Sequence, residues 1–177
     1  SFNKVYTNII SNIDKAIVFV SSNTAAVMDN GNDIGGSSAA TGNTITNVCG
    51  LVSGAMSGYL SVTISSTAIQ MNSQVGDNVS FNTITSATNI TTLATNGLIG
   101  IFKSQSFQPT GLTFTSNYNN NTVTLTNAAT TSQMTGIGMQ GLTTLSTATY
   151  NCNNNNIINC SLTGAGVTTA TIIGMFH

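Results

Sequence analysis

Ionisable side chains are scarce in this sequence, and their scarcity limits the chemistry that it can perform. The 177 residues contain three Lys, no Arg, four Asp, no Glu and one His. A glycosidase needs two or three carboxyl groups a few ångströms apart, and a polysaccharide lyase needs a cationic base beside a carboxylate-bound cation. The acidic and basic residues are Asp14, Asp29, Asp33, Asp77, Lys4, Lys15, Lys103 and the terminal His177. The aspartates fall in predicted loops or strand ends and the lysines are scattered, so we expect no catalytic site.

One short segment could bind a metal ion. Residues 29–33 read Asp-Asn-Gly-Asn-Asp, so Asp29 and Asp33 could contribute carboxylate oxygens to Ca²⁺, which takes six to eight oxygen ligands. The segment lacks a full EF-hand loop and the nonapeptide repetition of calcium-binding β-rolls, and Asp, Asn and Gly also form ordinary turns. A plain turn is the simpler interpretation, Ca²⁺ is the alternative, and we expect no other cofactor.

Charge and apolar patterning exclude two classes of partner. The formal net charge is −1 and the three lysines do not cluster, so we expect no surface that neutralises nucleic-acid phosphates. No apolar run approaches the 18 or more residues of a membrane-spanning helix, so we expect no membrane span. Cys49, Cys152 and Cys160 are an odd number without metal-type spacing. One disulfide could form among them, but three small buried thiols is the simpler interpretation.

The overall composition favours an all-β protein. Charged residues make up 4% of the chain, against about 25% in an average soluble domain. Helices usually cover their exposed faces with Glu, Lys and Arg, whereas Asn, Thr, Ser and Gly dominate here. Asn, Gly and Ser favour turns, and Thr with Val and Ile favours strands.

A short strand pattern recurs along the chain. Asn-Thr-Ile-Thr at residues 43–46 returns at residues 82–85 and, with Val for Ile, at residues 121–124, each time 39 residues later. Weaker copies begin at Asn8 and at Asn155, which are 35 and 34 residues from their neighbours. The repeat of 34–39 residues therefore predicts coils that start near residues 8, 43, 82, 121 and 155.

Two further elements accompany the first strand. We assign the second to residues 17–20, 58–62, 97–101, 136–139 and 172–175, where Gly and large apolar residues alternate in most copies. We assign the third, looser element to residues 26–28, 68–71, 112–115 and 147–150. Three short strands per repeat predict a right-handed parallel β-helix of about five coils, forming a single segment over residues 1–177. The repeat runs at both ends, so we expect the segment to belong to a longer chain.

The alternation within the first strand gives each side chain a direction. An inward column of Ile10, Ile45, Ile84, Val123 and Ile157 could stack along the axis and bury an apolar core. The neighbouring threonines would then form outward columns of Thr44, Thr83 and Thr122 and of Thr46, Thr85 and Thr124. The Asn that heads each strand can hydrogen-bond its counterparts above and below, and Asn tolerates the left-handed conformation of tight corners. We predict an Asn ladder of Asn8, Asn43, Asn82, Asn121 and Asn155.

These repeats, with Asn-Asn-Thr-Val at residues 120–123 and Gly-Ile-Gly-Met at residues 136–139, resemble the parallel β-helix (pectin-lyase-like) repeats of large secreted surface proteins, which are frequent among Bacteroidetes. The resemblance covers residues 8–176 and rests on short motifs. It implies an extracellular or cell-surface location and adhesin-like or stalk-like work.

The leading functional hypothesis is a non-catalytic structural or adhesive module of an extracellular surface protein or filament. Its surface of hydroxyl and amide groups suits contacts with carbohydrate, with cell surfaces or with neighbouring subunits of the same protein. One alternative is a polysaccharide-binding or polysaccharide-degrading β-helix. The other is an ice-binding protein that uses the outward Thr columns.

Overall fold

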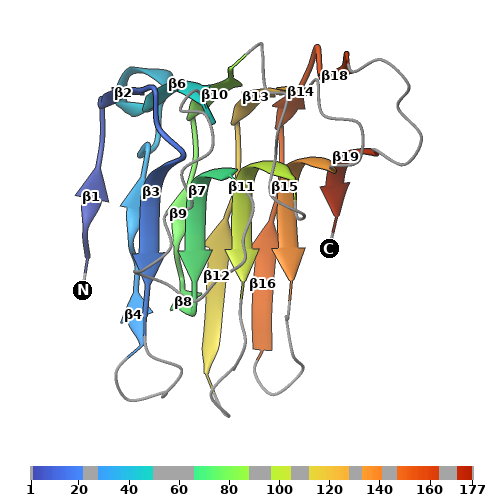
Figure 1. Cartoon of the computed structure of the whole chain (residues 1–177). Helices are drawn as coiled ribbons and strands as arrows, with labels where there is room; N and C mark the ends of the chain where they lie inside the picture. The colour runs from blue at the N-terminus through green and yellow to red at the C-terminus, as the bar shows by residue number, and fades with distance from the viewer. Residues whose placement is uncertain are drawn as a thin grey trace.

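Each short strand of the repeat pairs in parallel with its counterpart in the next coil, and together the strands build an all-β solenoid. The computed structural model describes residues 2–21, 28–49, 66–87, 97–104, 112–127, 133–140, 147–163 and 171–176. In these ranges three sheets contain five parallel strands each, and every coil adds one strand to each sheet (Figure 1). The expected fold class is confirmed. No helix in the described ranges has the length and apolar character needed to cross a membrane.

The three sheets are named A, B and C here. Sheet A contains β1 (Lys4–Val5), β5 (Asp33–Ile34), β9 (Asn78–Val79), β12 (Thr113–Asn117) and β16 (Thr147–Asn151). Sheet B contains β2 (Ile9–Ser11), β6 (Thr44–Val48), β10 (Thr83–Ser86), β13 (Thr122–Thr124) and β17 (Asn156–Ile157). Sheet C contains β3 (Lys15–Val20), β7 (Ser66–Asn72), β11 (Leu98–Ser104), β15 (Met134–Gln140) and β19 (Ile172–Phe176). Shorter pairs join β4 (Asp29–Asn30) to β8 (Gln74–Val75) and β14 (Thr126–Asn127) to β18 (Ser161–Leu162), and a 3₁₀ turn, η2, spans Ala39–Thr41.

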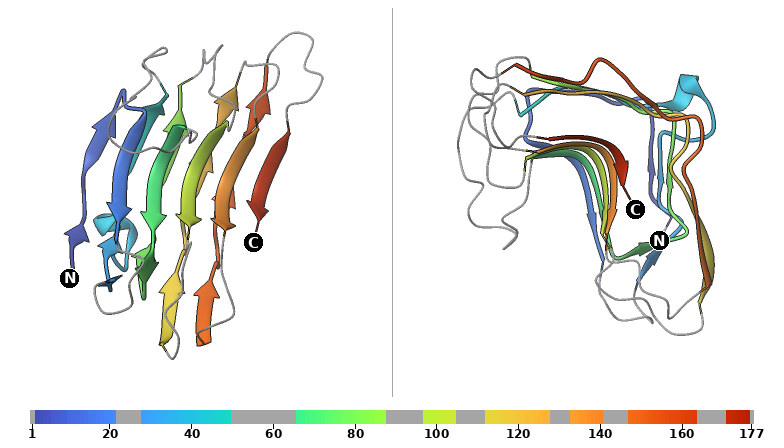
Figure 2. Two further views of the ribbon diagram at one scale, coloured as in Figure 1. Left: turned by 60° about the horizontal axis from the view of Figure 1, so that its bottom comes forward. Right: turned by 90° about the vertical axis from the view of Figure 1, so that its right-hand side faces the viewer.

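The winding is right-handed, as expected. Seen from the C-terminal end (Figure 2, right), the chain rises through sheet A, crosses sheet B and descends through sheet C while it advances toward the viewer. This counter-clockwise advance is the sense that parallel strand crossovers adopt in nearly all folds. The three sheets enclose one continuous apolar core along the axis.

Sheet B has the register that the repeat predicts. Ile84 pairs with Ile45 on one side and with Val123 on the other, and the column continues to Ile10 and Ile157. Ile84 is completely buried, whereas the adjacent Thr83 is exposed. Alternating exposure of this kind arises because successive side chains of a strand point to opposite faces.

The second element is displaced in the second coil. β11 pairs with β7, so that Ile101 lies opposite Ile69. The assignment of residues 68–71 to the third element is therefore wrong, and residues 58–62 lie outside the described residues. The fixed period failed because the connections differ in length: sheets B and C begin at Thr44 and Ser66 in the second coil, 22 residues apart, but at Thr83 and Leu98 in the third, 15 apart.

The third element is correct in the later coils only. Residues 112–115 and 147–150 fall largely in β12 and β16, which pair with each other. In the two preceding coils sheet A contains Asp33–Ile34 and Asn78–Val79. Of the predicted residues 26–28, the first two lie outside the described residues. The sheet A strands of these two coils are only two residues long, so they give almost no alternation for a sequence pattern to reveal.

Small residues let sheet C approach sheet B closely. A Cβ atom at Gly100 would lie 2.6 Å from Val123 Cγ1, and one at Gly136 would lie 2.7 Å from Ile157 Cδ1. Val123 is completely buried at this contact. The Gly of the second element therefore complements the β-branched residue of the first.

Candidate functional site

The outward threonines lie in sheet B, but their two columns differ in regularity. Thr44, Thr83 and Thr122 pair in register, and the column continues to Ile9 at one end and Asn156 at the other. In the second column Thr85 pairs with Thr124, but the register between β6 and β10 shifts after Ile84, so Thr46 does not align with Thr85. Thr44 and Thr83 are exposed and the other four threonines are partly exposed.

The five ladder asparagines lie directly above one another. The Nδ2 of each donates to the Oδ1 of the next, at 2.9 Å for Asn8–Asn43 and Asn43–Asn82 and at 3.1 Å for the two later steps. The backbone N–H of each donor residue bonds the same oxygen. Each Nδ2 also donates to a carbonyl on the preceding corner, such as Val79 O for Asn121. Asn43, Asn82 and Asn121 are thereby buried with their polar atoms satisfied.

The left-handed corner residue differs from the one expected. The ladder asparagines do not adopt a positive φ. The residue before four of them does, with φ of 55° at Thr7, 61° at Phe81, 57° at Asn120 and 55° at Asn154, whereas Gly42, before Asn43, has a φ of −61°. Only Asn and Gly adopt this region readily, so a bulky residue such as Phe81 is strained there. The corner therefore holds an aromatic ring in a position that backbone energetics alone disfavours.

The Asp29–Asp33 segment forms part of two paired strands. Asp29 pairs with Gln74 and Asp33 with Asn78, which places the segment on sheet A and its short extension β4. The Asp33 carboxylate accepts hydrogen bonds from the hydroxyl of Tyr6, from Gly36 N at 3.1 Å and from Asn78 Nδ2 at 2.6 Å. In the described ranges no three His, Cys, Asp or Glu side chains gather as metal ligands would. The three cysteines are half-buried free thiols.

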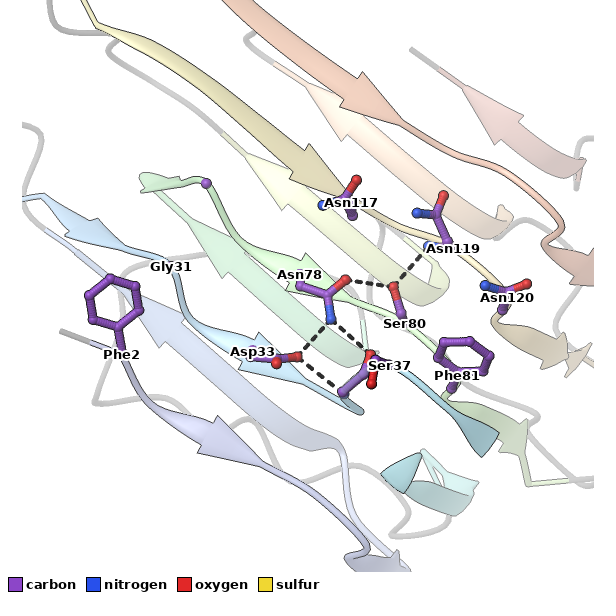
Figure 3. Close-up of a pocket in the computed structure, with 12 residues that line it drawn as sticks. Phe2, Gly31, Asp33, Ser37, Asn78, Ser80, Phe81, Asn117, Asn119 and Asn120 are labelled. Carbon is purple, nitrogen blue, oxygen red and sulfur yellow. Dashed lines mark hydrogen bonds between the residues drawn. The ribbon is translucent and has the colours of Figure 1, made fainter. Parts of the chain in front are cut away.

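A polar groove of about 510 Å³ lies on the outer face of sheet A, where the chain turns toward sheet B (Figure 3). Four successive coils contribute to it. Its lining residues are Phe2, Gly31, Asp33, Gly36, Ser37, Gly76, Asn78, Ser80, Phe81, Asn117, Asn119 and Asn120. Phe2 and Phe81 lie at opposite ends, with the amide, hydroxyl and carboxylate groups between them. The groove thus combines two aromatic rings with a row of hydrogen-bonding side chains.

Hydrogen bonds between coils hold the groove side chains in place. Asn78 Nδ2 donates to Asp33 Oδ1 and to Gly36 O, and Asn78 Oδ1 accepts from Ser80 Oγ at 2.7 Å. Asn119 Oδ1 and Asn117 Oδ1 accept from the fifth coil, at 2.7 Å from Asn153 N and 2.9 Å from Asn151 Nδ2. Their Nδ2 groups have no partner among the described residues, so they face the groove as available donors.

A buried ion pair lies directly beneath this groove. Lys103 Nζ is 3.0 Å from Asp77 Oδ1, and both side chains are completely buried. Asp77 lies between Gly76 and Asn78, which both line the groove, and its carboxylate also accepts from Ser116 Oγ at 2.6 Å and from the Tyr118 hydroxyl. Lys103 further donates to Gln74 O. This polar centre joins sheet C to the inner side of the strands that carry the groove.

The ionisation of the polar centre follows from its surroundings. Burial alone would raise the pKa of the Asp77 carboxyl, but the charge of Lys103 and the hydrogen bonds from Ser116, Tyr118 and Lys103 hold that pKa below its usual value. Burial lowers the pKa of Lys103, and Asp77 partly opposes the effect. Burial and the charge of Asp77 raise the pKa of Tyr118 well above its usual value. At neutral pH the lowered pKa of Asp77 and the raised pKa of Tyr118 give a carboxylate and a neutral phenol, and Lys103 Nζ lies 3.0 Å from that carboxylate.

The sequence contains a sign of this polar centre, but it is visible only when the strands of sheet C are aligned correctly. Lys103 pairs with Met71 and Met139, so it occupies a position that is apolar in the adjacent coils. Asp77 follows Asn32 along the axis and precedes Ser116, as the neighbouring pairs show. With the correct register, one charged residue in each of two opposed inward columns would have been visible.

Comparison with protein-family models, with curated proteins and with solved structures gave no match to this chain. The resemblance to pectin-lyase-like surface proteins therefore rests on the repeat motifs alone.

Proposed function

We propose that this chain is a non-catalytic structural and adhesive module of an extracellular surface protein or filament, and that its groove binds carbohydrate. The observation that carries the proposal is the groove itself, where amide and hydroxyl groups from several coils lie between two aromatic rings. A sugar ring has hydroxyl groups around its rim and C–H groups on its faces, so it can meet both kinds of partner. The resemblance of the repeats to those of secreted surface proteins of Bacteroidetes supports the extracellular location.

The placement of the carboxylates supports adhesion over catalysis. Asp77 is completely buried and paired with Lys103, so it is not accessible to a substrate. Asp33 faces the groove, but three donors already engage its carboxylate. Neither arrangement gives the pair of accessible carboxyl groups that glycoside hydrolysis requires.

Carbohydrate binding is tested with the Phe81→Asn variant. Asn occupies the same corner in the next two coils, at Asn120 and Asn154, and it tolerates the positive φ, so the variant removes the ring while relieving backbone strain. We expect wild-type protein to be retarded in affinity electrophoresis by at least one neutral polysaccharide. We expect the variant to bind about tenfold more weakly, as for the loss of one aromatic contact worth about 1.4 kcal/mol.

Thr149→Ala is the matched control, because Thr149 is exposed on β16 and does not line the groove. Equal binding by wild type and Phe81→Asn would show that the groove is not the binding site. Failure of wild type to bind any polysaccharide would contradict carbohydrate adhesion. Depolymerised products in the same mixtures would favour the polysaccharide-degrading alternative.

Ice binding is a second candidate because Thr44, Thr83 and Thr122 lie in register on one face. It predicts thermal hysteresis and faceted ice crystals in dilute solution, both lost in Thr83→Tyr because the bulky ring interrupts the flat Thr array. The shifted register at Thr46 shortens that array, so we expect any activity to be weak. Normal ice growth in the presence of wild type would remove this candidate.

A further inference from the structure

The polar side chains of the groove lie in columns that run parallel to the solenoid axis. Asp33, Asn78 and Asn117 occupy the same position on sheet A in the second, third and fourth coils. Ser80 and Asn119 form a second column beside the first, and Asn119 N donates to Ser80 Oγ at 3.3 Å (Figure 3). Neighbouring strands lie about 4.8 Å apart, so hydrogen-bonding groups recur at that interval along the groove.

The second and fourth coils offer different hydrogen-bonding groups. In the fourth coil, the Oδ1 atoms of Asn117 and Asn119 accept hydrogen bonds from the fifth coil. This bonding turns both Nδ2 groups back toward the groove as donors. In the second coil, the Asp33 carboxylate accepts from three groups, and a carboxylate has about four acceptor positions. A ligand that satisfies both coils must therefore accept at one point and donate at another, about 10 Å away along the axis.

The charge of the groove limits the class of glycan that it can take. Among the described residues that line the groove, Asp33 alone is charged. A uronate or sulfate group would meet this carboxylate without a cation beside it, and like charges brought together in this way oppose binding. A sugar hydroxyl both donates and accepts, so hydroxyl groups serve the Asn donors and the Asp33 acceptor equally well. The groove therefore suits an uncharged glycan.

The spacing of the coils selects further among uncharged glycans. When sugars are joined through equatorial bonds at positions 1 and 4, the two bonds leave opposite sides of each ring and the chain is extended. Each sugar then advances the chain by about one strand spacing. An axial bond at position 1, as in α-1,4-linked glucans, turns the chain at every sugar and coils it. Only the extended chain stays in phase with the columns over several coils.

Given the carbohydrate binding proposed above, on which this depends, we propose that the groove binds an unbranched, uncharged β-1,4-linked glycan that lies along the solenoid axis. One sugar lies on each of the second, third and fourth coils. Hydroxyl oxygens of the sugar on the fourth coil accept from Asn117 and Asn119, and a hydroxyl group of the sugar on the second coil donates to Asp33. The sugar on the third coil lies beside Asn78 and Ser80.

Isothermal titration calorimetry with oligosaccharides of one to six sugars tests this arrangement. The probes are the β-1,4-linked series of glucose, mannose and N-acetylglucosamine, and the α-1,4-linked glucose series is the comparison. For at least one β-1,4 series we expect the affinity to rise about fivefold per sugar up to three sugars, as one net hydrogen bond per coil gives, and to change less than about twofold beyond three. The α-1,4-linked trisaccharide should bind at least about tenfold more weakly than the β-1,4-linked one.

The Asn117→Asp variant tests the position of the glycan. It removes a donor from the groove but keeps the bond from Asn151 Nδ2, because a carboxylate oxygen accepts as the amide Oδ1 does. We expect it to bind the β-1,4-linked trisaccharide about fivefold more weakly than wild type. Asn153→Asp is the matched control, because it introduces the same charge at an exposed position of the fifth coil that does not line the groove, and it should bind as wild type does.

Three results would overturn the proposal: equal affinity for the α-1,4-linked and β-1,4-linked trisaccharides, an affinity that does not grow from one to three sugars, or unchanged binding by Asn117→Asp. If a polysaccharide still retards wild type in affinity electrophoresis, carbohydrate adhesion survives these results. Failure of wild type to bind any polysaccharide or oligosaccharide would contradict both the proposed function and the orientation of the glycan.

Discussion

Replacing Lys103 by Met is expected to lower the free energy of unfolding by about 3–5 kcal/mol, because it leaves the Asp77 carboxylate buried without its counter-ion. Met fills the equivalent inward position in both adjacent coils, at Met71 and Met139, so a Met side chain at position 103 should pack in the column as its neighbours do. Both partners are completely buried, and water therefore does not compensate the lost charge. Urea denaturation followed by circular dichroism measures the change.

The double variant Lys103→Met with Asp77→Asn separates charge from packing. Asn occupies the corresponding position in the second coil, at Asn32, and its carbonyl oxygen can still accept from Ser116 or Tyr118. We expect the double variant to recover most of the loss, since an uncharged pair removes the desolvation cost of two ions. Lys4→Met, at an exposed position, is the control and should change stability by less than about 0.5 kcal/mol. Equal instability of the single and double variants would contradict an electrostatic origin.

The same pair makes stability depend on acid. Because the pKa of Asp77 is lower in the folded protein than in the unfolded chain, its contribution is complete above the unfolded value of about 4 and is lost as the pH falls below it. The lowered pKa of Lys103 has the opposite effect, because losing its proton relieves the cost of burying its charge. The double variant should therefore lose less stability than wild type between about pH 4 and pH 2.

Removing one central rung of the Asn ladder is the second large perturbation. Asn82→Ala would remove the acceptor of the buried Asn43 N–H and of one Asn43 Nδ2 hydrogen. Ile34 O would keep its bond from Ser80 N, and Asn121 Oδ1 would keep its bond from the backbone N–H of residue 82. At about 1–3 kcal/mol for each of these two buried Asn43 donors, we expect a loss of about 2–6 kcal/mol. Thermal and urea unfolding of the variant measure this loss.

Asn8→Ala is the matched comparison, because Asn8 belongs to the same ladder but is exposed at the first coil. Water can replace its bonds to Asn43, so we expect a loss of about 1 kcal/mol. Similar losses for Asn8→Ala and Asn82→Ala would show that burial does not determine the strength of the ladder.

The sequence predicted the parts of this fold that recur at a constant phase. Asn-Thr-Ile-Thr predicted sheet B correctly because the residues on both sides of the strand repeat together, so that the repeat alone aligns Ile84 with Ile45 and Val123. Sheet A was not predictable in its first coils, since β5 and β9 are two residues long. The predicted position of the second element was wrong in the second coil, because no local residue pattern determines the length of the connections between strands.

The candidate site was less accessible to sequence analysis. The Thr columns and the Asn ladder follow from alternation within one strand. The groove, however, is formed by residues of four coils, and it includes Phe81, whose positive φ no residue propensity would predict. The Lys103–Asp77 pair joins two sheets whose register has to be known first. Contacts that depend on relative register become visible only when all three strands of each coil are correctly aligned.

The buried ion pair also has a consequence for how the chain folds. Repeated coils can misassemble, because a coil that skips its neighbour meets almost the same surface on the next one. Lys103 breaks this equivalence: if β11 moved by one coil, its ammonium group would face Asn32 or Ser116 in place of Asp77, without a counter-ion. Because the neighbouring positions in both columns are uncharged, this one charge pair distinguishes the third coil from the other four and favours the correct register. The double variant that restores stability should accordingly refold with a larger misassembled fraction than wild type.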